Sequence, residues 1–165
     1  MIVRLVAVSL ALVLGLSACA SSDEDPPTSD RPEFAQEPGQ AGAERFASYW
    51  VETLNQATDS GDTETLRTLA SPECTSCEDF AQQLDTIYED GGRVESDGWA
   101  ITTIVPEAGA TEEAVGMLMT VNVSEQKVYE SAEAKADTFE GGTQAFRLAL
   151  VREDEDWFVD DLSPR

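Results

Sequence analysis

The sequence predicts an α+β fold in which helices come first along the chain and antiparallel strands follow. Two changes of pattern lead to this prediction. Between residues 42 and 90, apolar side chains recur every three or four positions, as on one face of a helix. From residue 99 onward they recur at every second position, as on one face of a strand. Because no internal repeat is visible, we expect residues 42–165 to form one globular domain.

Three helices are expected in the first half of this domain. The first, over residues 42–60, has an apolar face made of Ala43, Phe46, Ala47, Trp50, Leu54 and Ala57. Gly61 can end this helix in the left-handed conformation, and Asp62 can cap a short second helix. A third helix is expected over residues 77–90, where a Gly-Gly pair ends it.

The strands are expected in the second half of the domain. Residues 99–105 and 115–123 alternate between large apolar side chains and smaller or polar ones, which indicates half-buried strands. The acidic stretch 130–142 ends in glycines and predicts a loop. Residues 146–150 alternate again, and a short polar connection joins them to a last strand over 157–162. These two strands are expected to form a hairpin.

The charge of the chain excludes some classes of function. Its formal net charge is -23, from 33 acidic and 10 basic residues, and it has no histidine. A charge of this sign repels polyanions and no basic face is visible, so we expect no nucleic-acid partner. Without histidine, the chain lacks the commonest general base and metal ligand. No catalytic, phosphate-binding or calcium-loop motif is present, so the sequence predicts no catalytic residue, metal site or cofactor.

The first 18 residues have the features of a secretory signal peptide. Arg4 gives a positively charged start, and the apolar run LVAVSLALVLGL that follows is too short to span a bilayer comfortably. Ser17 and Ala18 are small and precede Cys19, a pattern that resembles the lipobox of bacterial lipoproteins. The resemblance implies cleavage before Cys19 and a lipid on its thiol, which would hold the protein at the extracytoplasmic face of the cell membrane. An ordinary secretory signal and an uncleaved anchor helix are the alternatives.

Residues 19–41 are expected to be a disordered tether between the lipidated Cys19 and the domain. They contain Pro26, Pro27, Pro32 and Pro38, several acids and almost no large apolar residue. A coil of this length reaches about 25 Å on average, so it would lift the domain off the bilayer.

Three short motifs stand out in the domain. They are the pair Tyr49-Trp50, the cysteine pair Cys74-x-x-Cys77 after a proline, and a Gly-Gly pair ahead of a strand that contains tryptophan. Over about residues 42–163, this pattern resembles a family of actinobacterial cell-envelope lipoproteins of unknown function. The resemblance implies a nuclear transport factor 2-like, or cystatin-like, fold, in which a curved antiparallel sheet wraps around helices and often leaves a conical cavity. That fold is used by both enzymes and interaction modules, so it does not decide the function.

Cys74 and Cys77 are the two cysteines that remain if Cys19 carries lipid. Outside the cytosol we expect them to form a disulfide, which would contribute roughly 2 kcal/mol and hold the start of the third helix. The same spacing at a helix N-terminus is used by redox dithiols. A zinc site is a weaker alternative, since two thiolates would need two further ligands.

Trp50, Tyr88 and Trp99 are the candidate pocket residues. Large aromatic side chains usually belong to the core, but they can also line a cavity and stack on an apolar or cyclic ligand. Tyr88 and Trp99 flank the junction between the predicted helices and the predicted sheet, where such a cavity would open.

The function that the sequence favours is a non-enzymatic, lipid-anchored domain that binds an unknown ligand or envelope protein at the outer membrane face. One alternative is a small cone-fold hydrolase or isomerase, which predicts a buried carboxylate with a raised pKa beside a pocket. The other is a structural accessory subunit of an envelope assembly, which predicts a filled cone and an exposed apolar patch.

Overall fold

The computed structural model describes residues 31–165, which form one compact unit. The predicted signal peptide, Cys19 and the first part of the predicted tether lie outside the described residues. The helical elements are η1 (Glu33–Ala35), α1 (Gly39–Ser60), α2 (Glu64–Thr68) and α3 (Thr75–Glu89). The strands are β1 (Arg93–Ser96), β2 (Trp99–Pro106), β3 (Ala114–Val123), β4 (Gln126–Tyr129), β5 (Asp137–Phe139), β6 (Gly142–Glu153) and β7 (Asp156–Pro164).

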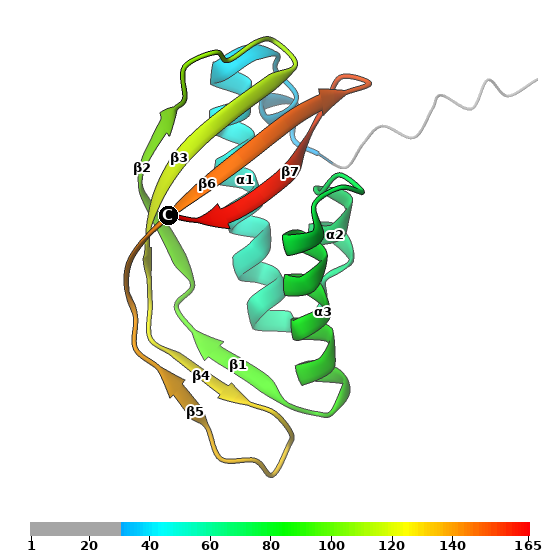
Figure 1. Ribbon diagram of the computed structural model, residues 1–165. Helices are drawn as coiled ribbons and strands as arrows, with labels where there is room; N and C mark the ends of the chain where they lie inside the picture. Colours follow the sequence, from blue (N-terminus) through cyan, green and yellow to red (C-terminus); the bar gives the residue numbers. More distant parts are fainter. Residues whose placement is uncertain (1–30) are drawn as a thin grey trace, which may run out of the picture. The chain divides into compact units, whose positions relative to one another are not determined.

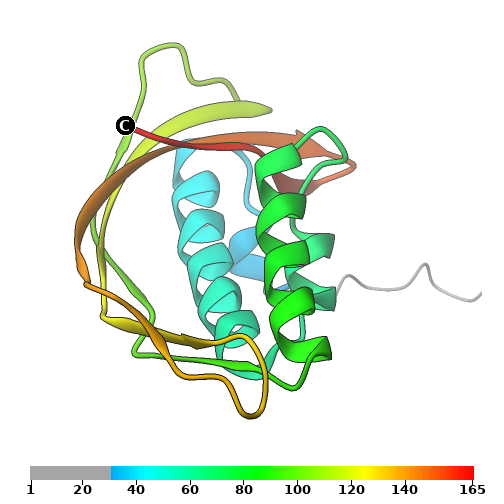
Figure 2. The same cartoon turned by 60° about the horizontal axis from the view of Figure 1, so that its bottom comes forward.

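The strands form two antiparallel sheets that follow one another along a curved surface. One sheet has the order β2-β3-β6-β7 and the other the order β1-β4-β5. The register shifts once between β2 and β3 and once between β6 and β7, and irregularities of this kind increase the bend and twist of a sheet. Figure 2 shows the strands wrapping around α1, with α3 beside it on the open side. The helices and sheets confirm the predicted α+β class.

The core lies between α1 and the sheet of β2, β3, β6 and β7. On α1, the side chains of Phe46, Trp50 and Leu54 are almost completely buried. On β3, alternate side chains are buried, from Val115 to Val123, as the period-two pattern predicts. Burial of each large apolar side chain contributes about 1.5–3 kcal/mol, so the two matched periodicities account for much of the stability of this layer.

The turns that the sequence predicts are present at both ends of the domain. Gly61 has φ +77° and ends α1, and a Cβ at this position would lie 2.2 Å from the ring of Tyr88. Strands β6 and β7 form the predicted hairpin, in which Asp154 and Glu155 both have positive φ. Two such residues give a turn whose twist matches that of the flanking strands.

The domain begins earlier than the sequence predicts. Instead of belonging to a tether that ends at residue 41, residues 31–38 pack against the domain, and α1 starts at Gly39. Ala35 is fully buried, and Trp157 Nε1 donates a hydrogen bond to the carbonyl oxygen of Glu37 at 2.8 Å. Arg31 donates to the carbonyl oxygens of Thr68 and Trp157. The prediction was wrong here because a few separate contacts hold this segment to the domain. A proline-rich, acidic composition is typical of disordered chain, so it gave no sign of these contacts.

Two short strands also depart from the expectation. The stretch 130–142, predicted as a loop, contains β5, and β6 begins at its last residue. β5 pairs with β4, with Phe139 opposite Gln126, but all three of its residues are exposed. β1, which pairs with β4 on the other side, was not predicted at all. Periodicity did not reveal these strands because they are too short or too exposed to alternate in burial.

Across residues 31–165, no helix combines the length and the apolar character that a membrane crossing requires.

Candidate functional site

Two depressions lie on opposite sides of α3, and Asp79 lines both. The first, the disulfide pocket, has a volume of about 470 Å³ and is lined by Leu66, Arg67, Ala70, Ser71, Pro72, Cys74, Thr75, Cys77, Glu78 and Asp79. The second, the helix–sheet groove, has a volume of about 990 Å³ and is lined by Asp79, Gln82, Gln83, Thr86, Ile87, Asp90, Gln126, Val128, Glu130 and Phe139. A smaller hollow of about 240 Å³ lies between β1 and β4.

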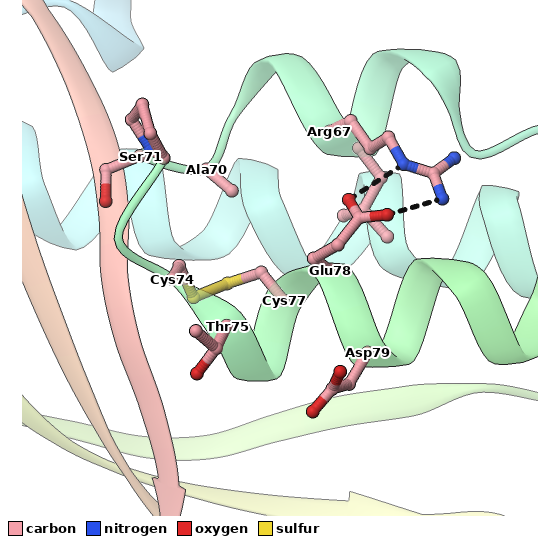
Figure 3. Close-up of a pocket in the computed structure, with 10 residues that line it drawn as sticks. Arg67, Ala70, Ser71, Cys74, Thr75, Cys77, Glu78 and Asp79 are labelled. Carbon is pink, nitrogen blue, oxygen red and sulfur yellow. Dashed lines mark hydrogen bonds and ion pairs between the residues drawn. A yellow bond between two sulfur atoms is a disulfide. The ribbon is translucent and has the colours of Figure 1, made fainter.

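The floor of the disulfide pocket is the bond between Cys74 and Cys77. The two Cα atoms are 5.3 Å apart and the cysteines are 3% and 7% exposed. Figure 3 shows the bridge at the start of α3, next to the turn that contains Ser71. The predicted disulfide is therefore present in the structure, and in this form neither sulfur is a free thiol. Its position ties the first turn of α3 to the connection from α2.

Arg67 of α2 dominates the other wall of this pocket. Its Nε and Nη2 donate to the two carboxylate oxygens of Glu78 at 3.0 and 3.1 Å, and Nη2 also donates to Asp85 at 2.7 Å. Thr63 Oγ1 donates to the other oxygen of Asp85 at 2.6 Å. The hydrogen bond from Arg67, followed by that from Thr63, holds the pKa of Asp85 below its usual value. Arg67 thus compensates Glu78 and Asp85 within the domain and joins α2 to α3, whereas Asp79, which also lines this pocket, is not part of this network.

The helix wall of the helix–sheet groove is the polar face of α3. Its members recur at spacings of three and one, which stacks them along one side of the helix: Asp79, Gln82, Gln83, Thr86, Ile87 and Asp90. All are exposed except Ile87, which is partly buried against the core. Figure 3 shows Asp79 on the side of α3 away from the Arg67–Glu78 pair.

The sheet wall of the groove comes from β4, the residue that follows it, and β5. Gln126, Val128 and Glu130 alternate along the chain and so lie on the same face of the sheet. Phe139 on β5 is opposite Gln126 and is 56% exposed, the largest exposed fraction among the large apolar residues of the described chain. Figures 1 and 2 both show β4 and β5 passing the C-terminal half of α3.

The carboxylates and side-chain amides of the groove lack partners inside the described part of the chain, whereas the Thr86 hydroxyl donates to the carbonyl oxygen of Gln82. Asp79, Asp90 and Glu130 form no ion pair there, in contrast to Glu78 and Asp85 across the helix. Within residues 31–165, the side-chain amides of the three lining glutamines have no hydrogen bond. The groove can therefore accept cationic groups at its carboxylates and can donate to, or accept from, a ligand at its amides. No group of residues that could hold a metal ion occurs among residues 31–165.

The predicted pocket residues do not line this groove. Trp50 is 1% exposed in the core, and its Nε1 has no hydrogen-bond partner in the described residues. Tyr88 packs against Gly61, and its hydroxyl donates to the carbonyl oxygen of Thr58 at 2.6 Å. Trp50 thus belongs to the core and Tyr88 is bound to α1, and neither lines any of the three depressions described above.

Trp99, the third predicted pocket residue, is also held by its neighbours. Its ring stacks on Phe146 with centroids 4.8 Å apart. Asn55 binds its backbone on both sides, accepting from the nitrogen at 2.8 Å and donating to the oxygen at 2.9 Å. None of the three predicted pocket residues therefore lines one of these depressions. The groove that exists was missed, because its residues resemble an ordinary solvated helix face in sequence.

Comparison with known proteins assigns the chain to a family. Residues 20–163 match the family of unknown function DUF6318, and the chain belongs to this family. No curated protein matches the chain.

Solved structures share the fold at low sequence identity. The intermembrane-space region of the chloroplast protein ARC6 superposes with a TM-score of 0.55 at 12% identity, covering 74% of this chain and 92% of that one. A protein from Novosphingobium aromaticivorans, provisionally named an aromatic ring hydroxylase, has a TM-score of 0.50 at 8% identity, covering 72% and 84%. An uncharacterized protein with a cystatin-like fold from Caulobacter vibrioides has a TM-score of 0.47 at 10% identity, covering 74% and 89%. The first two of these structures share the fold of this chain, with helices packed on curved antiparallel sheets, in agreement with the predicted α+β architecture.

Proposed function

We propose that this DUF6318 member is an extracytoplasmic binding domain, attached to the actinobacterial cell membrane through lipid on Cys19. In this proposal the helix–sheet groove holds a ligand or partner protein and no reaction is catalysed. The observation that carries the proposal is the set of polar groups in the groove, because Asp79, Asp90 and Glu130 have no cation to pair with among the described residues. Groups left uncompensated around an open depression are available to a partner.

The electrostatics of the domain favour binding over acid–base catalysis. A hydrolase or isomerase that uses a buried carboxylic acid needs a carboxyl whose pKa is raised. Within residues 31–165 the carboxyl with a shifted pKa is Asp85, and its pKa is lowered because Arg67 and Thr63 stabilise the charged form. Asp85 therefore has the properties of a structural ion-pair partner and not those of a general acid.

The proposed location at the membrane rests on the first 19 residues of the sequence. The tether expected between Cys19 and the domain is shorter than the sequence predicts, because residues 31–41 pack with the domain. Since Arg31 is already bound to the domain, only eleven residues lie between it and Cys19. Fully extended, a chain of this length spans about 40 Å, so a lipid on Cys19 would keep the domain close to the bilayer. The substitution Cys19→Ala should release the protein from the membrane fraction, and its retention there at full size would contradict the proposed anchor.

The binding role is tested by crosslinking from inside the groove. The photoreactive residue p-benzoylphenylalanine would replace Thr86 in the full chain, expressed in its own cell envelope and irradiated there. A control chain would carry the same residue at Ala100, which is exposed on β2 outside the groove. We expect a defined adduct from position 86 that is absent from position 100 and is reduced when Asp90→Asn and Glu130→Gln are added.

Two outcomes would contradict the proposal. Equal adducts from both positions would indicate contact by collision only. No adduct from position 86, with the protein intact and membrane-bound, would mean that the groove has no occupant.

A further inference from the structure

We infer that the helix–sheet groove binds an extended peptide segment with a basic side chain at each end and apolar side chains between them. This inference rests on the proposed binding function and names the class of partner.

The charge of the partner follows from the two ends of the groove. Asp79 lies near the start of α3, whereas Asp90 lies at its end and Glu130 lines the groove from beyond β4. None of the three is paired within residues 31–165, and no basic side chain lines the groove. In a chain of net charge -23, an anionic occupant would be repelled, whereas a cationic one would be attracted from a distance.

The length of the partner follows from helix geometry. Asp90 follows Asp79 by eleven positions, and with a rise of 1.5 Å per residue they lie about 16 Å apart along α3. An extended peptide advances about 3.3 Å per residue, so about five residues cover this distance. Two basic residues four or five positions apart would therefore reach both acidic ends.

The groove also offers apolar side chains. Ile87 of α3 and Val128 of β4 are partly buried, and Phe139 leaves 56% of its surface exposed beside them. Covering this surface would add a hydrophobic contribution that a purely polar cation could not supply.

The glutamines distinguish a peptide from other cationic chains. A side-chain amide both donates and accepts hydrogen bonds, as does each peptide group. Gln82 and Gln83 on one wall and Gln126 on the other have no intramolecular side-chain hydrogen bond among the described residues. A polyamine has no carbonyl oxygen to accept from them, so the amides favour a peptide.

The inference is tested by fluorescence anisotropy with the full chain in detergent micelles. The probe is a fluorescein-labelled peptide with the sequence Lys-Leu-Thr-Val-Lys, and the control peptide has glutamate at both ends. We expect saturable binding of the basic peptide only, weakened by added salt. The groove variant Asp79→Asn/Asp90→Asn/Glu130→Gln should weaken binding at least tenfold. Phe139→Ala should weaken it about threefold, on the scale of a modest apolar contact.

A matched control separates the groove from the overall charge. The variant Glu52→Gln/Asp59→Asn/Glu112→Gln removes three exposed carboxylates that do not line the groove, with the same change in net charge. It should bind the basic peptide within twofold of the wild type. Equal weakening in both variants would overturn the inference, because the peptide would then be responding to net charge alone.

Two further results would also overturn it. Absence of binding by the basic peptide would do so, and so would displacement of that peptide by spermidine at concentrations equal to those of an unlabelled copy. If crosslinking from position 86 persists while the basic peptide does not bind, the groove is a binding site for another class of partner. If both fail, the proposed function fails with the inference.

Discussion

The side of α3 that faces α2 and the side that lines the helix–sheet groove differ in where their charges are compensated. Glu78 and Asp85 face α2, where both bind Arg67, whereas the neighbouring Asp79 lines the groove without a cation. Successive helix residues are rotated by about 100° around the helix axis. Two adjacent acidic residues can therefore face different neighbours, so that one forms an ion pair and the other does not. The difference teaches that carboxylates compensated inside the domain serve its stability, whereas uncompensated ones are available for binding.

The largest effect is expected at Arg31, whose side chain is only 8% exposed and forms an ion pair with Asp156 at 3.9 Å. Its guanidinium also lies 4.4 Å above the ring of Phe158. Arg31→Met would leave Asp156 without its ion-pair partner and two carbonyl oxygens without their donor, so we expect the free energy of unfolding to fall by about 3 kcal/mol. Urea unfolding measures this loss. Arg45→Met, at an exposed pair with Glu37, is the control and should cost less than 1 kcal/mol. If both variants lose the same free energy of unfolding, burial does not make the Arg31 ion pair more stabilising than the exposed one.

Next in size is the disulfide that forms the floor of the disulfide pocket. Cys74→Ser/Cys77→Ser should lower the free energy of unfolding by about 2 kcal/mol, because the unfolded chain loses a short covalent loop. A thiol reductant should reproduce the loss in the wild-type protein and have no effect on the double variant. If the double variant and the wild type unfold at the same urea concentration, the bridge does not contribute to stability.

A smaller loss is expected for Asp85→Asn, which removes one partner of Arg67 but leaves Glu78 in place. Because the side chain of Asp85 is 31% exposed, solvent weakens the pair and we expect a loss of about 1 kcal/mol in urea unfolding. No measurable change would show that the internally compensated side of α3 is no more stabilising than the groove.

This contribution should also depend on pH. The pKa of Asp85 is lower in the folded protein than the usual unfolded value of about 3.9. A group with a depressed folded pKa contributes its stability above the unfolded pKa and loses it as the pH falls through the folded one. The stability difference between the wild type and Asp85→Asn should therefore be constant above about pH 5 and shrink below about pH 4. A stability difference between the two proteins that grows as the pH falls would contradict a lowered pKa of Asp85 in the folded protein.

The smallest effect is expected in the groove. Asp79→Asn, Asp90→Asn and Glu130→Gln remove carboxylates without ion-pair partners among the described residues, so each should change the free energy of unfolding by less than about 0.5 kcal/mol. Any change should be stabilising, because removing a negative charge reduces the repulsion within a strongly negative chain. A combined loss of more than 1 kcal/mol in urea unfolding would mean that the groove is structural, and the comparison with the disulfide pocket would fail.

The sequence by itself determined the elements whose burial alternates. The face of α1, the glycine that ends it, the buried side of β3 and the β6–β7 hairpin all follow from local periodicity and turn chemistry. The spacing of Cys74 and Cys77 also allowed a local disulfide, because three residues at a helix start keep two cysteines within bonding reach.

Only the tertiary structure decided which side chains have partners inside the domain and which are available to an external partner. The sequence did not distinguish Glu78 from Asp79, since their fates depend on Arg67, which approaches from a different helix. Nor did it reveal that Trp50 and Trp99 are held in place by other elements, or that residues 31–38 belong to the domain. Local periodicity records which face of an element is apolar, whereas the partner of a polar group is set by contacts between residues distant in the chain.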